Sequence, residues 1–526
     1  MAPRVLISDE LSPGALAVFA ERGVEARAKP GLGKDELLAE IAGYDGLAVR
    51  SATKVTEKVI AAAPRLKIIG RAGIGVDNID VKAATAKGII VMNTPFGNSI
   101  TTAEHTIALL LALARQLPAA DRSTQAGKWE KARFMGVEIT GKTLGLIGCG
   151  NIGAIVAERA RGLKMQVLAY DPFLAGERAI VLGVEKVELD VLLRRADFIT
   201  LHTPLTDVTR NIIDAAALAR TKPGVRIINC ARGGLIDETA LAAALASGHV
   251  AGAALDVYAE EPATANPLFG RDDVICTPHL GAATTEAQEK VALQVAQQMC
   301  DFLLRGAISH AVNFPSITAE EAPRLGSYIR LADQLGSLSG QIVRSSLKEV
   351  RIDFVGDLAT MNTKALAAAA LAAVLRPMLE GANMVSAPQI AKERGIAVIE
   401  STRGPHGAYG SYMRLTLQTE RQERTAGGTV FADGRPRLVE IGGISLEAEL
   451  APHMLYTENA DKPGYVGALG TMLGNAGVNI ASFHLGRDQR GGHAIALLEL
   501  DERLNDDVLA GVRKLPQVVR AERLAF

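Results

Sequence analysis

The chain has 526 residues, with 57 basic against 58 acidic side chains, and 48% of its residues are apolar against 22% charged. This length predicts several domains, and the balanced charge gives no reason to expect nucleic acid or an acidic membrane as a partner. The first ten residues lack the layout of a secretory signal. The apolar run at 367–382 is too short and too interrupted to span a bilayer, so we expect a cytoplasmic protein that does not bind membranes.

The four cysteines are far apart and none shows C-x-x-C spacing. Neither a metal site nor a disulfide framework is therefore indicated, and we expect buried thiols. The positions are Cys149, Cys230, Cys276 and Cys300.

Short β-rich runs alternate with helical stretches over the first hundred residues, from RVLIS to IIVMN. That alternation predicts a parallel sheet with crossover helices. Residues 99–127 follow, and the first half of this stretch is apolar almost all round, as in a helix buried between two bodies. The alternation restarts at KTLGLIGCG and continues to VICTPH, which predicts a second doubly wound unit.

Residues 284–306 form a long amphipathic stretch that could return the chain to the first unit, so that one α/β domain is inserted into another. Residues 311–450 combine a helical start, an Ala-rich helix and late β-like runs, without a constellation of catalytic groups. RGPHGAYGSY in this region, which includes His406, is interpreted as a structural loop rather than an anion site. The last 75 residues have the order β-α-β-β-α-β, which is the ferredoxin-like plan.

The stretch GCGNIG fits the pattern G-x-G-x-x-G, with Gly148, Gly150 and Gly153 between an apolar run and a helical stretch. The first glycine permits a tight turn, the second lets the backbone approach a pyrophosphate, and the third allows close helix packing. The helix N-terminus presents free N–H groups to the phosphates. Asp171 ends the next strand, where its carboxylate can bind ribose hydroxyls and repel a 2'-phosphate. The motif alone could be structural, but this context predicts NAD rather than NADP.

Hydride transfer from a hydroxyl carbon leaves a proton that a side chain must accept, and histidine titrates in the right range. His279 follows a buried-type strand at its carboxyl end, where open α/β sheets bind their ligands. Glu261 follows the preceding strand and could orient the imidazole. Arg232 ends one strand earlier and could hold a carboxylate and polarise a carbonyl. Each alone could be a surface or capping residue, but three consecutive strand ends favour a catalytic site.

The other histidines are not expected to take part in the chemistry. His105, His249 and His310 lie in or beside helical runs, and we expect no polar cluster around them.

The strand-end set ARGG, LDVYAEEP and TPHLGA, together with VRSATKV, GRAGIGVDNID, NTPFGNS and GCGNIG, resembles the D-isomer-specific 2-hydroxyacid dehydrogenases. Within them the chain is most similar to the long form, which has two extra C-terminal domains. The resemblance implies NAD-dependent oxidation of 3-phospho-D-glycerate to 3-phosphohydroxypyruvate, the first step of L-serine biosynthesis. A homo-oligomer, a dimer of dimers, is also implied.

The resemblance further implies an α/β fold with a Rossmann-type nucleotide domain inserted in a flavodoxin-like substrate domain. An α+β intervening domain and a ferredoxin-like βαββαβ ACT domain would follow. The expected boundaries are 1–97 with 284–310 for the substrate domain, 98–283 for the NAD domain, 311–450 for the intervening allosteric substrate-binding-type domain, and 451–526 for the ACT domain.

In this family the residue matching His279 is the acid/base, Glu261 supports it, and Arg232 binds the substrate's carboxylate and keto group. Glu260 is assigned to solvent. Ile74 stands where some relatives have threonine, so only a backbone contact to the cofactor is expected there. The remaining cofactor contacts implied are Gly148, Gly150, Asn151, Ile152, Gly153, Asp171, Thr203, Cys230, Ala231, Arg232, Asp256 near the nicotinamide, His279, Gly281 and Ala282.

The substrate has a carboxylate and a phosphate, so its domain should supply cations. Arg50 and Arg71 directly follow apolar strands and could point into the interdomain cleft. Lys131 and Arg133 are further phosphate candidates, possible donors to a neighbouring subunit or simply a solvated charge run. The resemblance adds Gly73 and Asn98 to the substrate-binding set.

The ACT resemblance implies a serine site, with Asp461 before a helix and Asn479 as the matching amide across a subunit interface. A plain helix N-cap is the alternative role of Asp461. Two other functions stay open from the sequence. One is a glyoxylate or hydroxypyruvate reductase of the same family, and the other is a non-enzymatic NAD-sensing partner protein.

Overall fold

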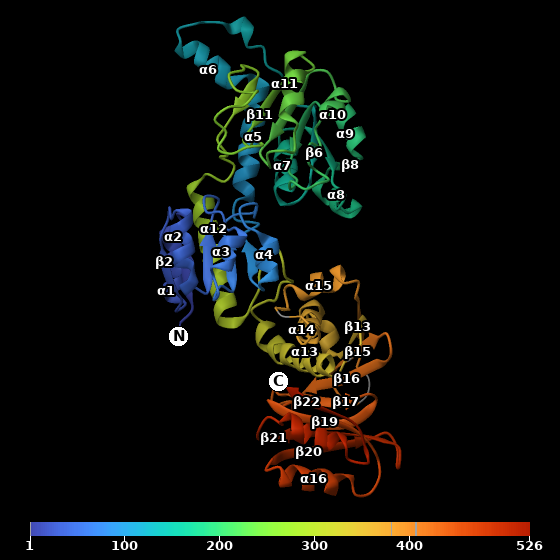
Figure 1. The fold of residues 1–526 in the computed structure, drawn as a ribbon. Coiled ribbons are helices and arrows are strands. Elements are labelled where there is room, and N and C mark those ends of the chain that lie inside the picture. The colour runs from blue at the N-terminus through green and yellow to red at the C-terminus, as the bar shows by residue number, and fades with distance from the viewer. Residues whose placement is uncertain (1, 344, 380, 406–407) are drawn as a thin grey trace.

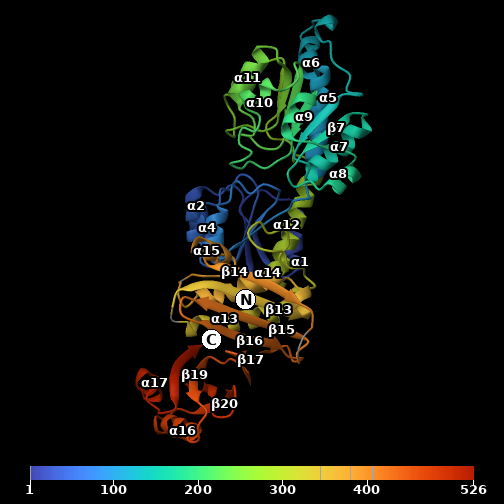
Figure 2. The ribbon, with the colours of Figure 1, turned by 90° about the vertical axis from the view of Figure 1, so that its right-hand side faces the viewer.

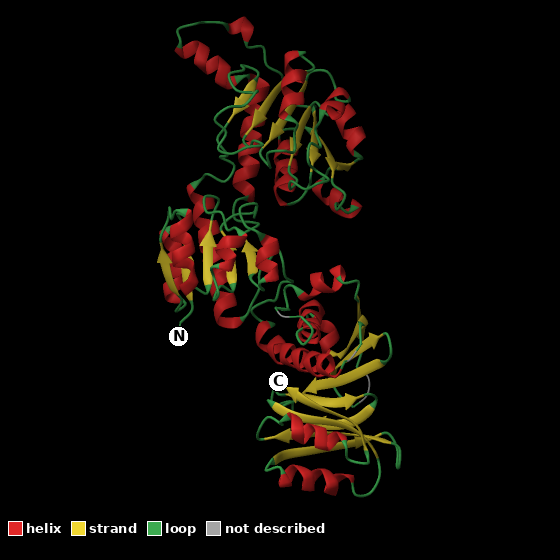
Figure 3. Cartoon of the chain, viewed as in Figure 1, coloured by secondary structure: helices red, strands yellow, loops and turns green. Residues whose placement is uncertain are grey.

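The computed structural model describes residues 2–343, 345–379, 381–405 and 408–526, so His406 lies outside the described residues. Four sheets follow one another in an elongated molecule, with the second sheet at one end and the fourth at the other (Figure 1). Helices cover both faces of the first two sheets (Figure 3). The predicted fold class is confirmed, because two parallel α/β sheets precede two further sheets. None of the described helices is both long and apolar enough to cross a membrane.

The first sheet is parallel throughout and has the order β2-β1-β3-β4-β5, which is the flavodoxin-like order. Its central strands are apolar and buried because helices pack on both faces. The strands are β1 (Arg4–Ile7), β2 (Glu25–Ala28), β3 (Gly46–Val49), β4 (Ile68–Arg71) and β5 (Ile90–Asn93), and the helices are α1 (Pro13–Glu21), α2 (Lys34–Glu40), η1 (Ile41–Gly43), α3 (Glu57–Ala61) and α4 (Val81–Ala86).

The second sheet is also parallel and has the order β12-β11-β10-β9-β6-β7-β8, the doubly wound order of dinucleotide-binding units. The chain reverses its direction of winding between β6 and β9, where such sheets bind ligands. The strands are β6 (Thr143–Ile147), β7 (Gln166–Tyr170), β8 (Glu185–Lys186), β9 (Phe198–Leu201), β10 (Val225–Asn229), β11 (Val250–Leu255) and β12 (Val274–Cys276). The helices are α7 (Asn151–Gly162), α8 (Gly176–Leu182), α9 (Leu189–Arg195), α10 (Ala215–Ala219) and α11 (Glu238–Ala246).

Two long helices connect these units. Helix α5 (Ser99–Arg115) packs against α7, β10 and β11 of the second unit, and α12 (Thr285–Arg305) packs against α1 and β4 of the first. The helix expected in the apolar first half of 99–127 is α5, and it ends at Gln116, which adopts a left-handed conformation with φ of 53°. Helix α6 (Leu117–Gln125) and the short turn η2 (Lys131–Arg133) then form an arm at the end of the molecule (Figure 1).

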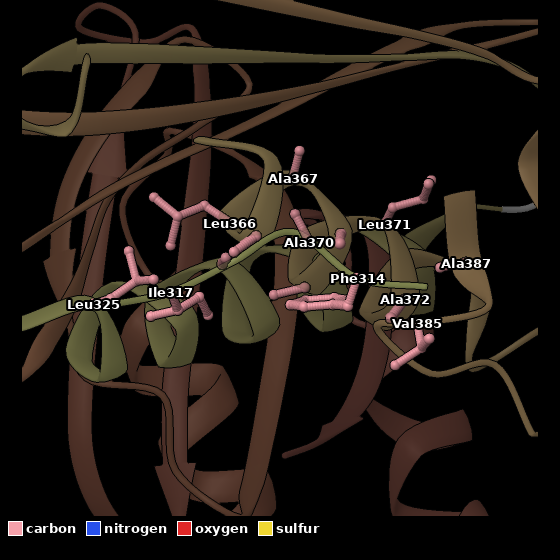
Figure 4. Close-up of a cluster of buried hydrophobic side chains, with 14 of the residues drawn as sticks. Phe314, Ile317, Leu325, Leu366, Ala367, Ala370, Leu371, Ala372, Val385 and Ala387 are labelled. Atoms are coloured by element: carbon pink, nitrogen blue, oxygen red, sulfur yellow. The ribbon is translucent and has the colours of Figure 1, made fainter. Parts of the chain in front are cut away.

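The third unit has a mixed six-stranded sheet whose helices lie side by side on one face. Gly336 and Gly340 of α13 let its backbone approach α14 closely, because a Cβ at either position would collide with α14 carbonyl groups. Figure 4 shows the small side chains of α14 beside Phe314 and Ile317. The elements are α13 (Ala322–Ile342), β13 (Leu347–Gly356), η3 (Asp357–Thr360), α14 (Thr363–Leu375), α15 (Ala387–Glu393), β14 (Ala397–Arg403), β15 (Ser411–Thr419), β16 (Glu423–Val430), β17 (Pro436–Ile441) and β18 (Ile444–Ala448).

The last unit is an antiparallel sheet of order β20-β21-β19-β22, with both helices on one side, as Figure 2 shows. The element order predicted for the last 75 residues is confirmed. The elements are β19 (His453–Ala460), α16 (Tyr465–Asn475), β20 (Ile480–Arg487), β21 (His493–Leu500), α17 (Asp506–Arg513) and β22 (Val518–Ala525).

Candidate active site

The glycine-rich turn lies between β6 and α7, at the point where the second sheet reverses its winding. Gly148 has φ of 93°, and a Cβ there would collide with the backbone carbonyl of His202. Gly153 packs equally close to the Gly148 carbonyl. Gly150 differs, because a Cβ at this position would meet nothing within 4 Å. The space in front of the N-terminus of α7, which starts at Asn151 and Ile152, is therefore open to a ligand.

Asp171 lies beside this turn at the end of β7. Its carboxylate oxygens accept hydrogen bonds from the backbone N–H groups of Cys149 at 2.8 Å and Phe173 at 2.8 Å. An anchored carboxylate next to an open helix N-terminus is the arrangement that binds a ribose and a pyrophosphate. The residues present therefore fit a dinucleotide without a 2'-phosphate.

The backbone of His202 and Thr203 packs against the glycine-rich turn at Gly148. The backbone nitrogen of Thr203 lies close to Gly148. His202 is half-buried with its Nδ1 out of contact with solvent, and this desolvation lowers its pKa to about 3; its Nε2 pairs with the Thr200 hydroxyl at 3.0 Å. The imidazole is therefore neutral at physiological pH and adds no charge beneath the phosphates.

His279 and Glu261 meet at the carboxyl edge of the second sheet. His279 follows β12 and adopts a left-handed backbone conformation with φ of 57°. Its Nδ1 lies 2.7 Å from Glu261 Oε2, while Glu261 Oε1 accepts a hydrogen bond from the backbone N–H of Tyr258 at 3.0 Å. The hydrogen bond to Glu261 raises the pKa of His279 and outweighs the effect of burial. Glu260, by contrast, is exposed.

Glu261 is ionised beside this imidazole. Burial pushes the pKa of Glu261 upward, but the hydrogen bonds from His279 and from Tyr258 N–H outweigh it and hold the pKa below its usual value. Because Nδ1 of His279 is engaged by Glu261, Nε2 is the ring nitrogen that remains for a substrate.

Arg232 follows β10, which is separated from β12 only by β11, so it lies at the same sheet edge as His279. Its Nε donates to Asp77 Oδ2 at 3.0 Å, and its Nη1 donates to the carbonyl of Ala231 at 2.6 Å. Asp77 belongs to the first unit, so the guanidinium touches both α/β units. The positive charge of Arg232 also acts on His279, whose pKa it lowers slightly against the larger effect of Glu261.

Arg71 ends β4 and faces Arg232 from the first unit. Burial lowers the pKa of Arg71 to about 10; the nearby charges of Arg232 and Arg50 add to this effect, whereas Asp77 and Asp9 oppose it. Its Nε is buried and finds no hydrogen-bond partner among the described residues. Three guanidinium groups therefore approach one another where the two α/β units meet, which is a site suited to an anion.

The other residues expected around the substrate lie on the loops near this cluster. Gly73 donates its N–H to the Thr94 hydroxyl at 2.7 Å, and the Ile74 carbonyl accepts from Asn93 at 2.6 Å. Asn98 is buried at the start of α5, and its Oδ1 has no partner among the described residues.

Lys131 and Arg133 are not brought to this cluster within the chain. Both lie in the arm, where Arg133 pairs with Asp272 at 2.6 Å and with Glu130 at 3.1 Å. Lys131 is exposed.

Asp256 is fully buried after β11, directly under the His279 loop. Its oxygens accept hydrogen bonds from the Thr277 hydroxyl at 2.6 Å, Leu280 N–H at 2.7 Å and Gly281 N–H at 2.8 Å. Burial alone would raise the pKa of Asp256, but these donors and His105 hold it below its usual value. Gly281 is buried and Ala282 half-buried after His279, whereas Cys230 and Ala231 lie beside Arg232.

Two expectations about other side chains are wrong. His105 lies 3.3 Å from both Asp256 Oδ1 and Thr277 Oγ1, and His249 hydrogen-bonds Thr221 at 3.0 Å, so both have polar partners. Those partners are distant in sequence. Cys276 is exposed rather than buried because it ends the edge strand β12, whereas the other three cysteines are buried.

Asp461 and Asn479, the two residues expected to bind a serine effector, both make hydrogen bonds within the last unit. Asp461 Oδ2 accepts from Arg487 at 2.9 Å and from Gly491 N–H at 2.8 Å, and these contacts lower its pKa. Asn479 donates to Asp501 at 2.7 Å. The N-cap interpretation of Asp461 is wrong, because α16 begins after Gly464.

Comparison with known proteins defines the class first. Residues 107–281 match the family model "D-isomer specific 2-hydroxyacid dehydrogenase, NAD binding domain". Among solved structures, the catalytic half resembles a glyoxylate reductase from Paecilomyes thermophila, with 31% identity, a TM-score of 0.55, and coverage of 59% of this chain and 98% of that one. NAD⁺-bound 3-phosphoglycerate dehydrogenase of Entamoeba histolytica gives 29% identity and a TM-score of 0.52 over 60% of this chain and 99% of that one. The protein is thus an NAD-dependent 2-hydroxyacid dehydrogenase.

The full length narrows the assignment. Residues 324–442 match the model "D-3-phosphoglycerate dehydrogenase intervening domain". The D-3-phosphoglycerate dehydrogenase of Synechocystis sp. is 43% identical over 97% of this chain and 93% of its own length. That of Bacillus subtilis is 40% identical over 98% of both chains. The chain belongs to the D-3-phosphoglycerate dehydrogenase family.

Proposed function

We propose that the protein oxidises 3-phospho-D-glycerate to 3-phosphohydroxypyruvate with NAD, at the first step of L-serine biosynthesis. The observation that supports this most directly is the His279–Glu261 pair at the sheet edge it shares with Arg232, which reaches across to the first unit. Full-length similarity to D-3-phosphoglycerate dehydrogenases favours this substrate over those of the sister reductases.

In the proposed mechanism, Nε2 of His279 accepts the proton of the substrate's 2-hydroxyl group as the C2–H bond breaks. NAD, when bound, supplies the hydride acceptor, so that an alcohol becomes a ketone. Glu261 stabilises the resulting imidazolium through Nδ1. Arg232 holds the carboxylate with its planar fork and polarises the developing carbonyl. Oxidation should therefore accelerate as the pH rises through the pKa of His279, and reduction should slow over the same interval.

The chain division proposed from the sequence suits this mechanism, with an NAD domain over 98–283 inserted in a substrate domain formed by 1–97 and 284–310. The intervening domain, 311–450, and the ACT domain, 451–526, complete the proposal. Within the NAD domain, the turn from Gly148 to Gly153 would hold the pyrophosphate, while the Asp171 carboxylate would hold the ribose hydroxyls.

The proposed reaction can be tested with a substrate panel. Purified protein should reduce NAD with 3-phosphoglycerate much faster than with D-lactate or D-glycerate, measured by absorbance of NADH. Faster NADH oxidation with glyoxylate or hydroxypyruvate would favour the sister reductase instead. Absence of turnover with every 2-hydroxy acid would favour the alternative that the protein is a non-enzymatic NAD-sensing partner protein.

Replacing Arg71 with Ala should raise the KM for phosphoglycerate about 100-fold while the KM for NAD changes little, because the variant loses a charge-assisted contact to the substrate's anionic groups. Steady-state kinetics at saturating NAD measure this. Arg27→Ala is a matched control, since Arg27 is exposed and its ion-pair partner among the described residues is Glu25, at the outer edge of the first sheet. Equal changes in both KM values would show that Arg71 is not a substrate ligand.

We further propose that the last unit is an ACT domain that binds serine at an interface between two copies of the chain. Asp461 would serve the ammonium group, the N–H groups at the N-terminus of α16 would serve the carboxylate, and Asn479 would be the matching amide across the interface. A homo-oligomer, a dimer of dimers, would create this interface. Serine at millimolar concentration should then lower the initial rate, and Asp461→Ala should abolish the effect without changing the basal rate. A flat serine response of the wild-type protein would remove this regulatory proposal.

A further inference from the structure

Helix α5 presents polar side chains to the catalytic edge of the second sheet. Thr102, His105 and Thr106 are spaced three and four residues apart, so they share one helix face, although most of the helix is apolar. The Thr102 hydroxyl lies 2.9 Å from the Gly281 carbonyl. His105 lies next to Asp256 and Thr277. This face therefore contacts the loop of His279 both before that residue, at Thr277, and after it, at Gly281.

The hydrogen-bond pattern determines which nitrogen of His105 bears a proton. The carboxylate of Asp256 only accepts hydrogen bonds, and the single hydrogen of the Thr277 hydroxyl is donated to it at 2.6 Å. Nε2 of His105 lies 3.3 Å from Asp256 Oδ1 and 3.3 Å from Thr277 Oγ1, so it faces two acceptors. Nε2 must therefore be the donor.

Asp256 in turn holds the backbone immediately after His279. Leu280 and Gly281, the two residues that follow His279, both donate their N–H groups to this carboxylate. His279 itself adopts φ of 57°, which is uncommon for a residue with a side chain and persists only where its surroundings fix it. A carboxylate with no exposed surface is costly unless it is fully hydrogen-bonded.

We propose that His105 is a positioning residue for the catalytic imidazole, because its Nε2–H fixes the buried Asp256 carboxylate that ties down the loop of His279. The inference rests on the proposed role of His279 in the dehydrogenase reaction. His105 lies on α5, about 170 positions before the loop of His279 in the sequence. In this proposal it acts through Asp256 and not by contact with the substrate.

His105 also acts on the charge that His279 experiences. The negative charge of Asp256 favours the imidazolium form of His279, and a donor at Asp256 damps that charge. Removing His105 should thus raise the pKa of His279, whether the lost ring is neutral or protonated. Among the described residues, the titratable and charged groups around the rings of His105 and His279 are Arg232 and Cys230 after β10, Asp256, Tyr258 and Glu261 after β11, and Cys276 on β12.

The test compares His105→Leu, which removes the donor, with His105→Gln, which retains an N–H at a similar reach. We expect His105→Leu to lower kcat for oxidation about tenfold and to move the acidic limb of the pH–rate profile upward by about half a pH unit. His105→Gln should restore most of both losses.

His249→Leu is the matched control, because His249 is also part-buried in the same unit. Its Nε2 donates to the Leu218 carbonyl at 2.9 Å and lies 3.0 Å from Thr221 Oγ1. His249→Leu should lower the urea midpoint without moving the pH–rate limb. An unmoved limb in His105→Leu, with a kcat loss no larger than that of His249→Leu, would overturn the inference. If His105→Leu does not fold, Thr277→Val, which removes a second hydrogen bond to Asp256, is measured against the same criteria.

A second measurement separates this inference from the proposed function. The pKa of His279 is followed by NMR in ligand-free protein labelled in its histidine rings, with His279→Gln used to assign the signal. A higher pKa in His105→Leu than in the wild-type protein supports the inference even if phosphoglycerate is not the substrate. Equal pKa values with normal phosphoglycerate turnover would refute the inference and leave the proposed function standing.

Discussion

Replacing His279 with Gln is expected to lower kcat for phosphoglycerate oxidation by roughly 1,000-fold, the scale of a lost general base. The reason is local, since Nδ1 is held by Glu261 and Nε2 is the nitrogen left to accept a proton. Gln retains a polar side chain of similar length but cannot take up the proton at neutral pH. Stopped assays at saturating substrate and NAD, over pH 6 to 10, provide the measurement.

Two comparisons make this result specific. The dissociation constant of NADH, read by fluorescence, should change less than about threefold, because the turn from Gly148 to Gly153 is untouched. His249→Gln should retain wild-type kcat, since that imidazole is bonded to Thr221 away from the sheet edge. A His279→Gln enzyme with more than about a tenth of wild-type kcat would exclude His279 as the acid/base.

Replacing Arg232 with Lys should lower kcat/KM for phosphoglycerate by about 100-fold, even though the charge is kept. An ammonium is a point charge, and it cannot offer two parallel N–H groups to a carboxylate while also polarising the neighbouring carbonyl. The loss should appear in kcat as well as in KM, because the carbonyl contact strengthens as the transition state forms.

The control for this substitution, Arg226, lies on β10, the strand that precedes Arg232. Arg226→Lys changes a guanidinium that lies over the ring of Phe198 on the neighbouring strand β9, and the kinetic constants of this variant should stay within about twofold of the wild type. An Arg232→Lys enzyme that differs from the wild type only in its KM for NAD would assign Arg232 to the cofactor rather than to the substrate.

Much of the fold follows from local pattern. Apolar strands buried on both faces, such as Val5 to Ile7, are visible as short hydrophobic runs, and Gly148 shows where a strand must turn sharply into a helix. Strand β2, with the sequence EARA, was not predicted, because an edge strand exposed on most sides needs no apolar residues. The break at Gln116 was not predicted either, although Pro118 at the start of α6 was a local signal for it, because proline has no N–H group and cannot continue a helix without a break.

The candidate site could be predicted in part for the same reason. His279, Glu261 and Arg232 each follow an apolar strand, and parallel strands bring their carboxyl ends to one edge. The partners of His105 lie more than 150 residues away in the sequence, so the local apolar pattern of α5 gave no sign of them. The spacing of Thr102, His105 and Thr106 was the available signal, because a polar stripe on an otherwise apolar helix indicates a polar neighbour.

The pair of Arg232 and Asp77 has a consequence for which anions can bind where the two α/β units meet. Asp77 competes with an incoming anion for the guanidinium of Arg232, and it does so at high local concentration because both residues belong to the same chain. Its side chain is 68% exposed, so water can solvate the carboxylate once an anion displaces it. An incoming carboxylate must displace it, so the step is an exchange in which the guanidinium always keeps a counterion. A small monovalent ion gains little from such an exchange, whereas a bidentate carboxylate attached to a second anionic group gains contacts at two arginines at once.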